Sequence, residues 1–206
     1  MEFRIREAMN TDADGIVGVV RAVYDEYGFT WDAEEYHADL YDPETHYSSR
    51  GDRFLVAVEQ DSGCLEQDAD ADAGTMNDDR GTMNGEIVTS MTPILGVVGL
   101  CFHPTIPGEP GITILHDGKV RAAGSDCSLE RLYVHPDARR RGIGEALIRD
   151  VISRAKSRGR KVMELWSDKR FGDAHRLYGR FGAITIGDRI CHDPDQSPEW
   201  GLVIHL

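Results

Sequence analysis

The part of the sequence that most constrains the fold lies between Leu129 and Ser167. An apolar segment at 129–134 is followed by a glycine-containing turn, a helix with one apolar face at 142–158 and a second apolar segment at 161–167. A strand–helix–strand unit of this length predicts two parallel strands joined by a crossover helix. Upstream, consecutive strand-like segments predict antiparallel pairing. The expected fold is therefore α/β with a mixed sheet.

The rest of the chain predicts further strands and helices. Asn10 or Thr11 offers an N-cap to a helix whose apolar residues, from Ile16 to Val23, share one face. The segment Trp31–Leu40 is expected to form a second, short helix, and Pro43 to lie in the loop after it. The other expected elements are strands at 3–5, 53–59, 94–102, 183–189 and 200–206, a small hairpin at 112–118 and a helix at 173–181.

A stretch of unusual composition separates two of these strands. Residues 61–92 are acidic and poor in large apolar side chains, and they repeat Gly-Thr-Met-Asn at 74–77 and 81–84. This composition predicts a mobile insertion within a single domain over residues 1–206. Its aspartates imitate the spacing of a calcium loop, but Ala73 replaces the turn glycine and Asp79 the bidentate glutamate. A calcium site is therefore not expected.

Composition narrows the class of protein. The chain has 206 residues, a formal net charge of −13 and no apolar run near the roughly 20 residues that a membrane span needs. The charge argues against nucleic acid as a partner, and it is compatible with a cationic substrate or simply with solubility. The charged, alternating start predicts a strand and not a signal peptide, so we expect a cytoplasmic protein without a membrane anchor. The four cysteines form no C-x-x-C pair, which predicts free thiols and no metal site.

The turn before the 142–158 helix has the features of an anion site. Three arginines, Arg139–Arg141, precede Gly142-Ile143-Gly144 at the predicted helix start. A helix start leaves about four backbone N–H groups without partners, and glycine lets an anion approach them closely. The Walker pattern and the G-x-G-x-x-G fingerprint are both absent. On its own, the cluster still allows a nucleic-acid patch or a solvated turn.

Two motifs together resemble a known family. The segment 132–147, read as a strand followed by Arg-x-x-Gly-x-Gly and a helix, resembles the acetyl-CoA-binding motif of the GNAT N-acetyltransferase superfamily. Arg139, Gly142 and Gly144 fill its defined positions. The segment 174–182 resembles the family's later helix, and Tyr178 stands where the motif of that helix has its tyrosine. The two motifs stand in the family's order, and the resemblance covers most of the chain.

The resemblance implies a fold and a co-substrate. It implies a mixed, mostly antiparallel sheet of six or seven strands with helices on both faces, splayed between the parallel strands 129–134 and 162–167. Acetyl-CoA is then the expected co-substrate, without a metal. The apolar pattern of 129–134 changes parity, which indicates a bulge near Glu130-Arg131 or, alternatively, a two-sided strand. The residues implied in acyl-CoA binding are Leu132, Tyr133, Val134, Arg139, Arg140, Arg141, Gly142, Ile143, Gly144, Glu145, Phe171 and Tyr178.

The resemblance also suggests two catalytic residues. Removing the proton of an alkylammonium at pH 7 costs roughly 4.6 kcal/mol, so a base is useful. Glu130 stands where some relatives carry such a glutamate, although an ion pair with a neighbouring arginine would also explain it. Tyr178 matches the tyrosine that donates to the departing sulfur, although its place on an apolar helical stripe suits a core residue as well.

One residue departs from the family pattern. Phe171 stands where many relatives have an asparagine that helps to hold the cofactor, and Arg170 is a candidate substitute. The expected function is transfer of an acetyl group from acetyl-CoA directly to a primary amine of a small molecule or peptide. The alternative is a GNAT-like module that senses acyl-CoA without turnover. Dimerisation is common in the family, so a homodimer is a further expectation. Several acidic residues of the first two helices favour a cationic amine or form a solvated face: Asp25, Glu26, Glu34, Glu35 and Asp39.

Overall fold

The computed structural model describes residues 2–60 and 92–206. The expected insertion at 61–92, with its repeat and its aspartates, lies outside the described residues except for Thr92. Within the described part, no helix has the length and apolar character to cross a membrane.

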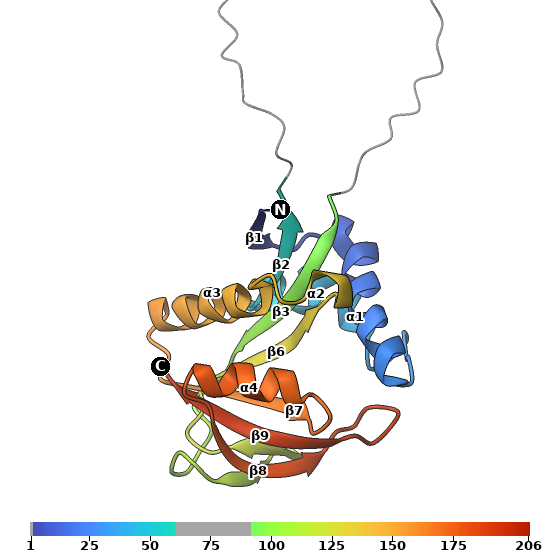
Figure 1. The fold of residues 1–206 in the computed structure, drawn as a ribbon. Helices are drawn as coiled ribbons and strands as arrows, with labels where there is room; N and C mark the ends of the chain where they lie inside the picture. Colours follow the sequence, from blue (N-terminus) through green and yellow to red (C-terminus); the bar gives the residue numbers. More distant parts are fainter. Residues whose placement is uncertain (1, 61–91) are drawn as a thin grey trace, which may run out of the picture.

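Seven strands form one mixed sheet, in the order β1-β2-β3-β6-β7-β9-β8 (Figure 1). The pair β6–β7 is parallel and the other neighbours are antiparallel. The strands β4 and β5 form a separate hairpin. The mixed sheet and this hairpin confirm the sequence-based prediction. The strand bounds are β1 Phe3–Glu7, β2 Arg53–Glu59, β3 Ile94–Phe102, β4 Thr113–His116, β5 Lys119–Ala122, β6 Cys127–Val134, β7 Val162–Asp168, β8 Ile184–Ile190 and β9 Pro198–His205.

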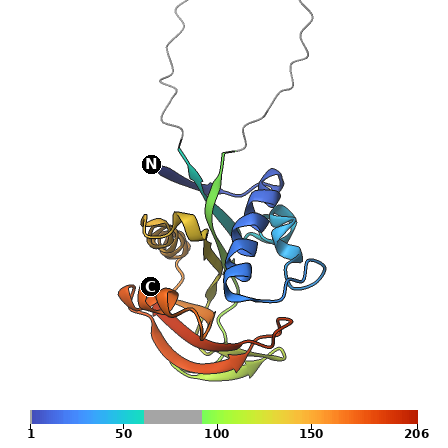
Figure 2. The same ribbon diagram turned by 45° about the vertical axis from the view of Figure 1, so that its right-hand side comes forward.

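Helices cover both faces of the sheet (Figure 2). Helix α1, Ala13–Tyr27, packs on one face through Ile16, Val19 and Val20. Helices α3, Ile143–Ser157, and α4, Gly172–Arg180, cover the other face. Leu147, Ile148 and Val151 of α3 are fully buried there. Each helix presents its apolar stripe to the sheet, as its sequence pattern predicts.

The predicted helix at 31–40 is wrong. The segment consists of turns, with one 3-10 turn at Ala38–Leu40. The carboxylate of Asp32 accepts hydrogen bonds from the backbone N–H groups of Glu34, Glu35 and Tyr36, as a helix cap does. The turn does not continue as a helix because the N–H of His37 bonds five residues back, to the carbonyl oxygen of Asp32 at 2.9 Å.

The position expected for Pro43 is also wrong. This proline is the first residue of a short helix, α2, Pro43–His46. Proline is well suited to the first helical position because its missing N–H has no partner there in any case. The side chain of Asp42 accepts from the N–H of Thr45 at 3.1 Å and so caps this helix.

The parallel strands β6 and β7 separate after a short paired stretch. Their register runs from Cys127 opposite Met163 to Leu129 opposite Leu165, and the pairing ends there. On the other side of β6, Gly99 pairs with Glu130 and Val97 with Tyr133, so β6 contains one more residue than β3 between these pairs. Arg131 has φ +52° within this bulge. The bulge expected near Glu130-Arg131 and the splay are therefore confirmed.

Gly201 of β9 provides a test of the packing below the splay. A Cβ atom at this position would lie 2.6 Å from the Trp166 ring. We expect Gly201→Ala to lower the free energy of unfolding by about 1–3 kcal/mol through overpacking. Gly179→Ala on α4, where a Cβ would meet nothing within 4 Å, is the control and should raise stability by roughly 0.5–1 kcal/mol. Denaturant unfolding of both variants measures the difference, and equal midpoints would contradict the packing argument.

Candidate active site at the strand splay

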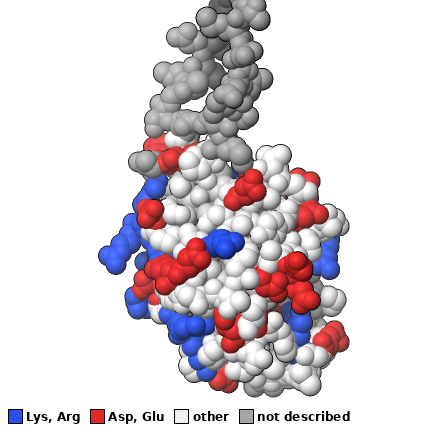
Figure 3. Space-filling model, turned by 90° about the vertical axis from the view of Figure 1, so that its right-hand side faces the viewer, with Lys and Arg blue, Asp and Glu red and all other residues white. Residues whose placement is uncertain are grey.

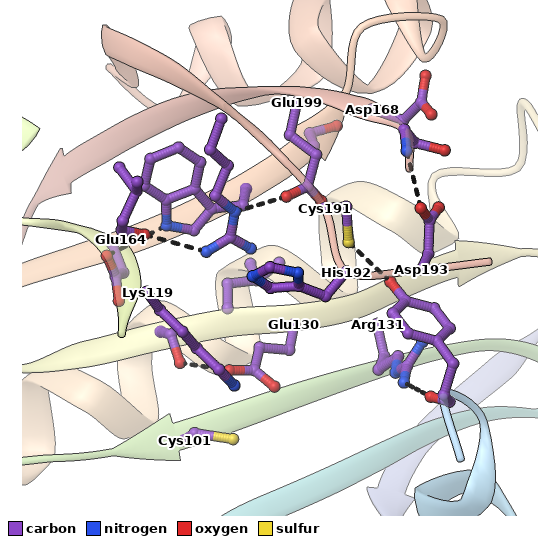
Figure 4. A pocket seen from close by; sticks show the side chains of 18 of the residues that line it. Cys101, Lys119, Glu130, Arg131, Glu164, Asp168, Cys191, His192, Asp193 and Glu199 are labelled. Atoms are coloured by element: carbon purple, nitrogen blue, oxygen red, sulfur yellow. Dashed lines mark hydrogen bonds and ion pairs between the residues drawn. The ribbon is translucent and has the colours of Figure 1, made fainter. Parts of the chain in front are cut away.

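A cavity of about 1110 Å³ opens where β6 and β7 separate. Its walls come from β3, β6 and β7, the β4–β5 hairpin, the segment that follows α1 and the loop between β8 and β9 (Figure 4). Five of the residues predicted for the site line it together: Glu130, Leu132, Tyr133, Phe171 and Tyr178. Segments far apart in the sequence thus meet at one opening in the sheet.

Glu130 occupies the first position of β6 beyond the last parallel pair. Leu129 points into the core that α3 covers, so strand alternation turns Glu130 to the opposite face. Its side chain is exposed to the cavity, and Oε1 accepts a hydrogen bond from Ser128 Oγ at 2.9 Å. Within residues 2–60 and 92–206 this carboxylate makes no ion pair, which leaves it available to a bound group.

The neighbouring arginine has a partner elsewhere. Arg131 forms a forked ion pair with Asp39, at 3.0 and 2.9 Å, and donates to the carbonyl oxygen of Tyr36. Tyr47 donates to the same carboxylate at 2.6 Å. This half-buried network fixes the segment after α1 against the bulge of β6. Nothing in the sequence indicates the pair, because its members are far apart in the chain.

Tyr178 belongs to both environments that its sequence pattern allows. It lies in the core cluster under α4 with 5% of its surface exposed, and it also lines the cavity. Burial raises the pKa of its phenol above the usual value, whereas a hydrogen bond with Ser167 lowers it by less. The phenol therefore keeps its proton through the neutral range and can act as a donor.

Phe171 replaces polar contacts with aromatic ones. Its ring meets those of Tyr27, Phe29 and Tyr133 edge-on, with centroids 4.9, 5.6 and 6.4 Å away. It thereby joins the end of α1 to the start of α4. Arg170, the candidate substitute, pairs with Asp168 at 2.7 Å and lies over the ring of Phe29.

The arginine–glycine loop lies at the amino end of α3, outside the lining of the cavity. Gly142 is the N-cap with φ +80°, a conformation that favours glycine. Gly144 allows close packing, because a Cβ there would lie 3.2 Å from Leu177, a contact that this side chain would have to relieve. The first turn of α3, which includes Ile143, Gly144 and Glu145, presents backbone N–H groups and the positive end of the helix dipole.

The three arginines of this loop have different surroundings. Arg139 makes a forked ion pair with Glu26 of α1 at 2.8 and 2.5 Å. Arg141 lies 3.8 Å from Glu59, and its buried Nη2 has no hydrogen-bond partner among the described residues. Arg140 has φ +61°, and it makes no ion pair with any of the described residues. The free backbone N–H groups and Arg140 suit a multiply charged phosphate.

Comparison with known proteins decides the family. The model of the GNAT acetyltransferase family matches residues 17–183. This chain belongs to the GNAT acetyltransferase family. Its members transfer acyl groups from acyl-CoA.

Individual relatives of this GNAT protein are distant or partial. An uncharacterized N-acetyltransferase of Methanocaldococcus jannaschii is 44% identical over 54 residues, which are 26% of this chain and 24% of that protein. The match thus spans about a quarter of that relative's length. A GNAT-family acetyltransferase of Staphylococcus aureus shares the fold with a TM-score of 0.65 and 16% identity, covering 100% of this chain and 99% of that one. The PaiA N-acetyltransferase of Thermoplasma acidophilum, solved with coenzyme A, has a TM-score of 0.56 at 14% identity and full coverage of both chains.

The sequence reasoning missed a polar cluster of the cavity lining, formed by β8, β9 and the loop between them. Glu199 of β9 accepts from Arg189 Nε at 2.7 Å, and burial raises the pKa of its carboxyl. Tyr36 lies 3.4 Å from Cys191 Sγ, which joins the segment after α1 to the β8–β9 loop. No motif signals these residues; only the strand order brings them to the cavity.

The surface charges and the described cysteines can be compared with what the sequence predicts. On the face in Figure 3, acidic side chains form several clusters and basic ones lie among them or at the edges. Cys101, Cys127 and Cys191 are free thiols, as predicted, and Cys64 lies outside the described residues. Within the described ranges, no three potential metal-ligating side chains of His, Cys, Asp or Glu come together.

The Asp39–Arg131 pair provides a test of how the segment after α1 is held against the bulge of β6. Asp39→Asn leaves the charge of Arg131 without its counter-ion in a half-buried place, and we expect a loss of about 3 kcal/mol of unfolding free energy. Asp188→Asn, which removes an exposed partner of Lys169, is the matched control and should cost less than about 1 kcal/mol. Urea unfolding measures both, and a small loss in each variant would refute a structural role for the pair.

Proposed function

We propose that this GNAT protein is an acetyl-CoA-dependent N-acetyltransferase that transfers the acetyl group directly to a primary amine of a small molecule or peptide. One observation carries the proposal: Glu130 and Tyr178 line the same cavity at the splay of β6 and β7. A carboxylate without an ion pair and a buried phenol thus reach one space from different elements. These are the groups that amine attack on a thioester requires.

Glu130 serves as the base. A protonated amine is not a nucleophile, and Glu130 accepts its proton either directly or through a water molecule. The Ser128 hydroxyl, 2.9 Å from Oε1, holds the carboxylate in place without neutralising it. The carboxylate also favours binding of the ammonium form before the proton is lost.

Tyr178 serves the departing sulfur. Acetyl-CoA supplies an activated thioester; the amine nitrogen forms a bond to its carbonyl carbon, and the carbon–sulfur bond then breaks. The phenol of Tyr178 donates a hydrogen bond to the thiolate that leaves. Because burial raises the pKa of this phenol, hydrogen-bond donation is favoured over full transfer of its proton.

The backbone of β6 and the start of α3 hold the co-substrate. On the β7 side, β6 has no strand partner beyond Leu129, so the backbone of Leu132, Tyr133 and Val134 can pair with the amides of pantetheine. The N–H groups of Ile143, Gly144 and Glu145 and the arginines before them bind the pyrophosphate. Phe171 contributes an apolar contact where many relatives have an amide.

Release of CoA thiol tests the proposal. The purified protein is mixed with acetyl-CoA and a panel of polyamines, aminoglycosides, amino acids and peptides, and free thiol is measured. We expect thiol release with at least one amine, and a loss of about 10²-fold or more in kcat/KM for Glu130→Gln. Tyr178→Phe should lower kcat while leaving acetyl-CoA affinity unchanged.

Controls separate catalysis from binding. Glu109→Gln, on an exposed loop outside the cavity lining, should leave the rate unchanged. Binding of CoA without thiol release from any amine would instead favour a module that senses acyl-CoA. Failure to bind CoA would contradict both functions.

The ion pair between Arg139 and Glu26 gives a prediction for co-substrate affinity. Glu26 competes with the pyrophosphate for the guanidinium, so Glu26→Gln should tighten CoA binding by about 1.5- to 5-fold, the range for an exposed pair. Arg139→Ala should weaken it by about tenfold or more. Asp25→Asn, on the adjacent position of α1, is the control. Calorimetry measures the three affinities, and weaker binding in Glu26→Gln would show that Glu26 supports the site.

A further inference from the structure

Six of the charged side chains that line the cavity have a partner of opposite charge. Glu164 pairs with Arg121, and Glu199 pairs with Arg189 at 2.7 Å. The Arg131–Asp39 and Asp168–Arg170 pairs lie at the same opening. These groups are not free to select an acceptor.

Other carboxylates of the cavity accept hydrogen bonds from backbone N–H groups of the segments that form its walls. Asp52 accepts from the N–H of Phe102 at 2.7 Å, and Asp193 accepts from the N–H of Ser197 at 2.7 Å. Asp32 accepts from three backbone N–H groups, as described above. The cavity is lined by more carboxylates than cations, and these hydrogen bonds hold three of the carboxylates in place without cancelling their charge.

Four charged side chains remain without a charged or backbone partner among the described residues. They are two carboxylates, Glu35 and Glu130, and two cations, Arg50 and Lys119. The lining is negative overall, and Arg50 and Lys119 are its two cations without an ion pair among the described residues. A ligand that carries both an ammonium and a carboxylate can engage a free group of each sign.

Lys119 and Glu130 face each other across the cavity. Lys119 begins β5 of the hairpin, and its exposed side chain extends toward Glu130 of β6 (Figure 4). No ion pair joins the two groups in the described structure. Both groups are therefore available to a ligand in the cavity.

We propose that the amine acceptor also carries a carboxylate, as amino acids do, and that Lys119 binds this carboxylate while Glu130 faces the amine. This inference rests on the proposed function and names the class of its acceptor. A polyamine would bring a second cation towards Lys119, and a plain alkylamine would leave Lys119 without a partner. Lys119 is therefore a specificity residue contributed by the hairpin.

Matched acceptors test the inference. Steady-state rates are measured with glycine, β-alanine and longer amino acids, with the carboxamide of each, and with diamines of similar length. We expect kcat/KM to be about tenfold or more higher for the best amino acid than for its carboxamide, which is the usual effect of a charged hydrogen bond. The difference should lie mainly in KM.

Variants of Lys119 assign the effect to this side chain. Lys119→Met should remove the preference for the carboxylate, Lys119→Arg should retain most of it, and Lys119→Glu should shift the preference to diamines. Lys156→Met, an exposed lysine on α3 away from the cavity, is the control and should change nothing. Lys119 lies on an exposed hairpin, so its replacement leaves the core intact.

The outcomes that overturn the inference are distinct from those that overturn the proposed function. Equal or higher kcat/KM for carboxamides or diamines, or an unchanged preference in Lys119→Met, overturns the inference while acetyl transfer to amines stands. Acetylation of Lys119 itself, detected by mass spectrometry, also overturns it. If no amine releases CoA thiol, amino acids are titrated into the CoA complex of the unsubstituted protein and of Lys119→Met by calorimetry. Equal affinities in the two proteins overturn the inference.

Discussion

The structure depends on the early end of pairing between β6 and β7. If the two parallel strands stayed paired along their whole length, their backbone N–H and C=O groups would hydrogen-bond to each other, and the sheet would have no opening. Here the pairing stops at Leu129 and Leu165, and the bulge at Arg131 turns the rest of β6 away. The opening frees the backbone of β6 on one side and admits Glu130 and Tyr178 to a common cavity from different elements.

The ion pairs around this opening hold its walls more than they select ligands. Arg131 and Asp39 fix the segment after α1 to the bulge, and Arg121 and Glu164 fix the hairpin to β7. Burying such charges is unfavourable unless each has a partner of good geometry. Once these pairs are formed, few charges remain free, and those few carry the proposed chemistry and the proposed specificity.

The two glycines of the loop at α3 show how a motif combines separate physical requirements. Gly142 adopts a left-handed conformation that starts the helix, and Gly144 allows α4 to pack closely through Leu177. Both place the free N–H groups of the first turn where an anion can reach them. The motif is thus as much a packing requirement as a binding one.

Much of the fold follows from local patterns. The strand–helix–strand unit from Leu129 to Ser167 predicts a parallel pair, and the parity change in β6 predicts its bulge, because strand alternation and helix periodicity are read directly from residue order. The segment 31–40 was predicted wrongly because the N–H of His37 bonds five residues back, to the carbonyl oxygen of Asp32, and so leaves the helical pattern.

The sequence by itself determined the sheet type, the turn at α3 and, through the paired motifs, the candidates Glu130 and Tyr178. Only the tertiary structure decided which charges are paired: Arg139 with Glu26 and Arg131 with Asp39, while Lys119, opposite Glu130, has no ion pair among the described residues. Local patterns depend on neighbours within a few residues. Ion pairs depend on strand order and loop paths, which bring together residues that the sequence keeps far apart.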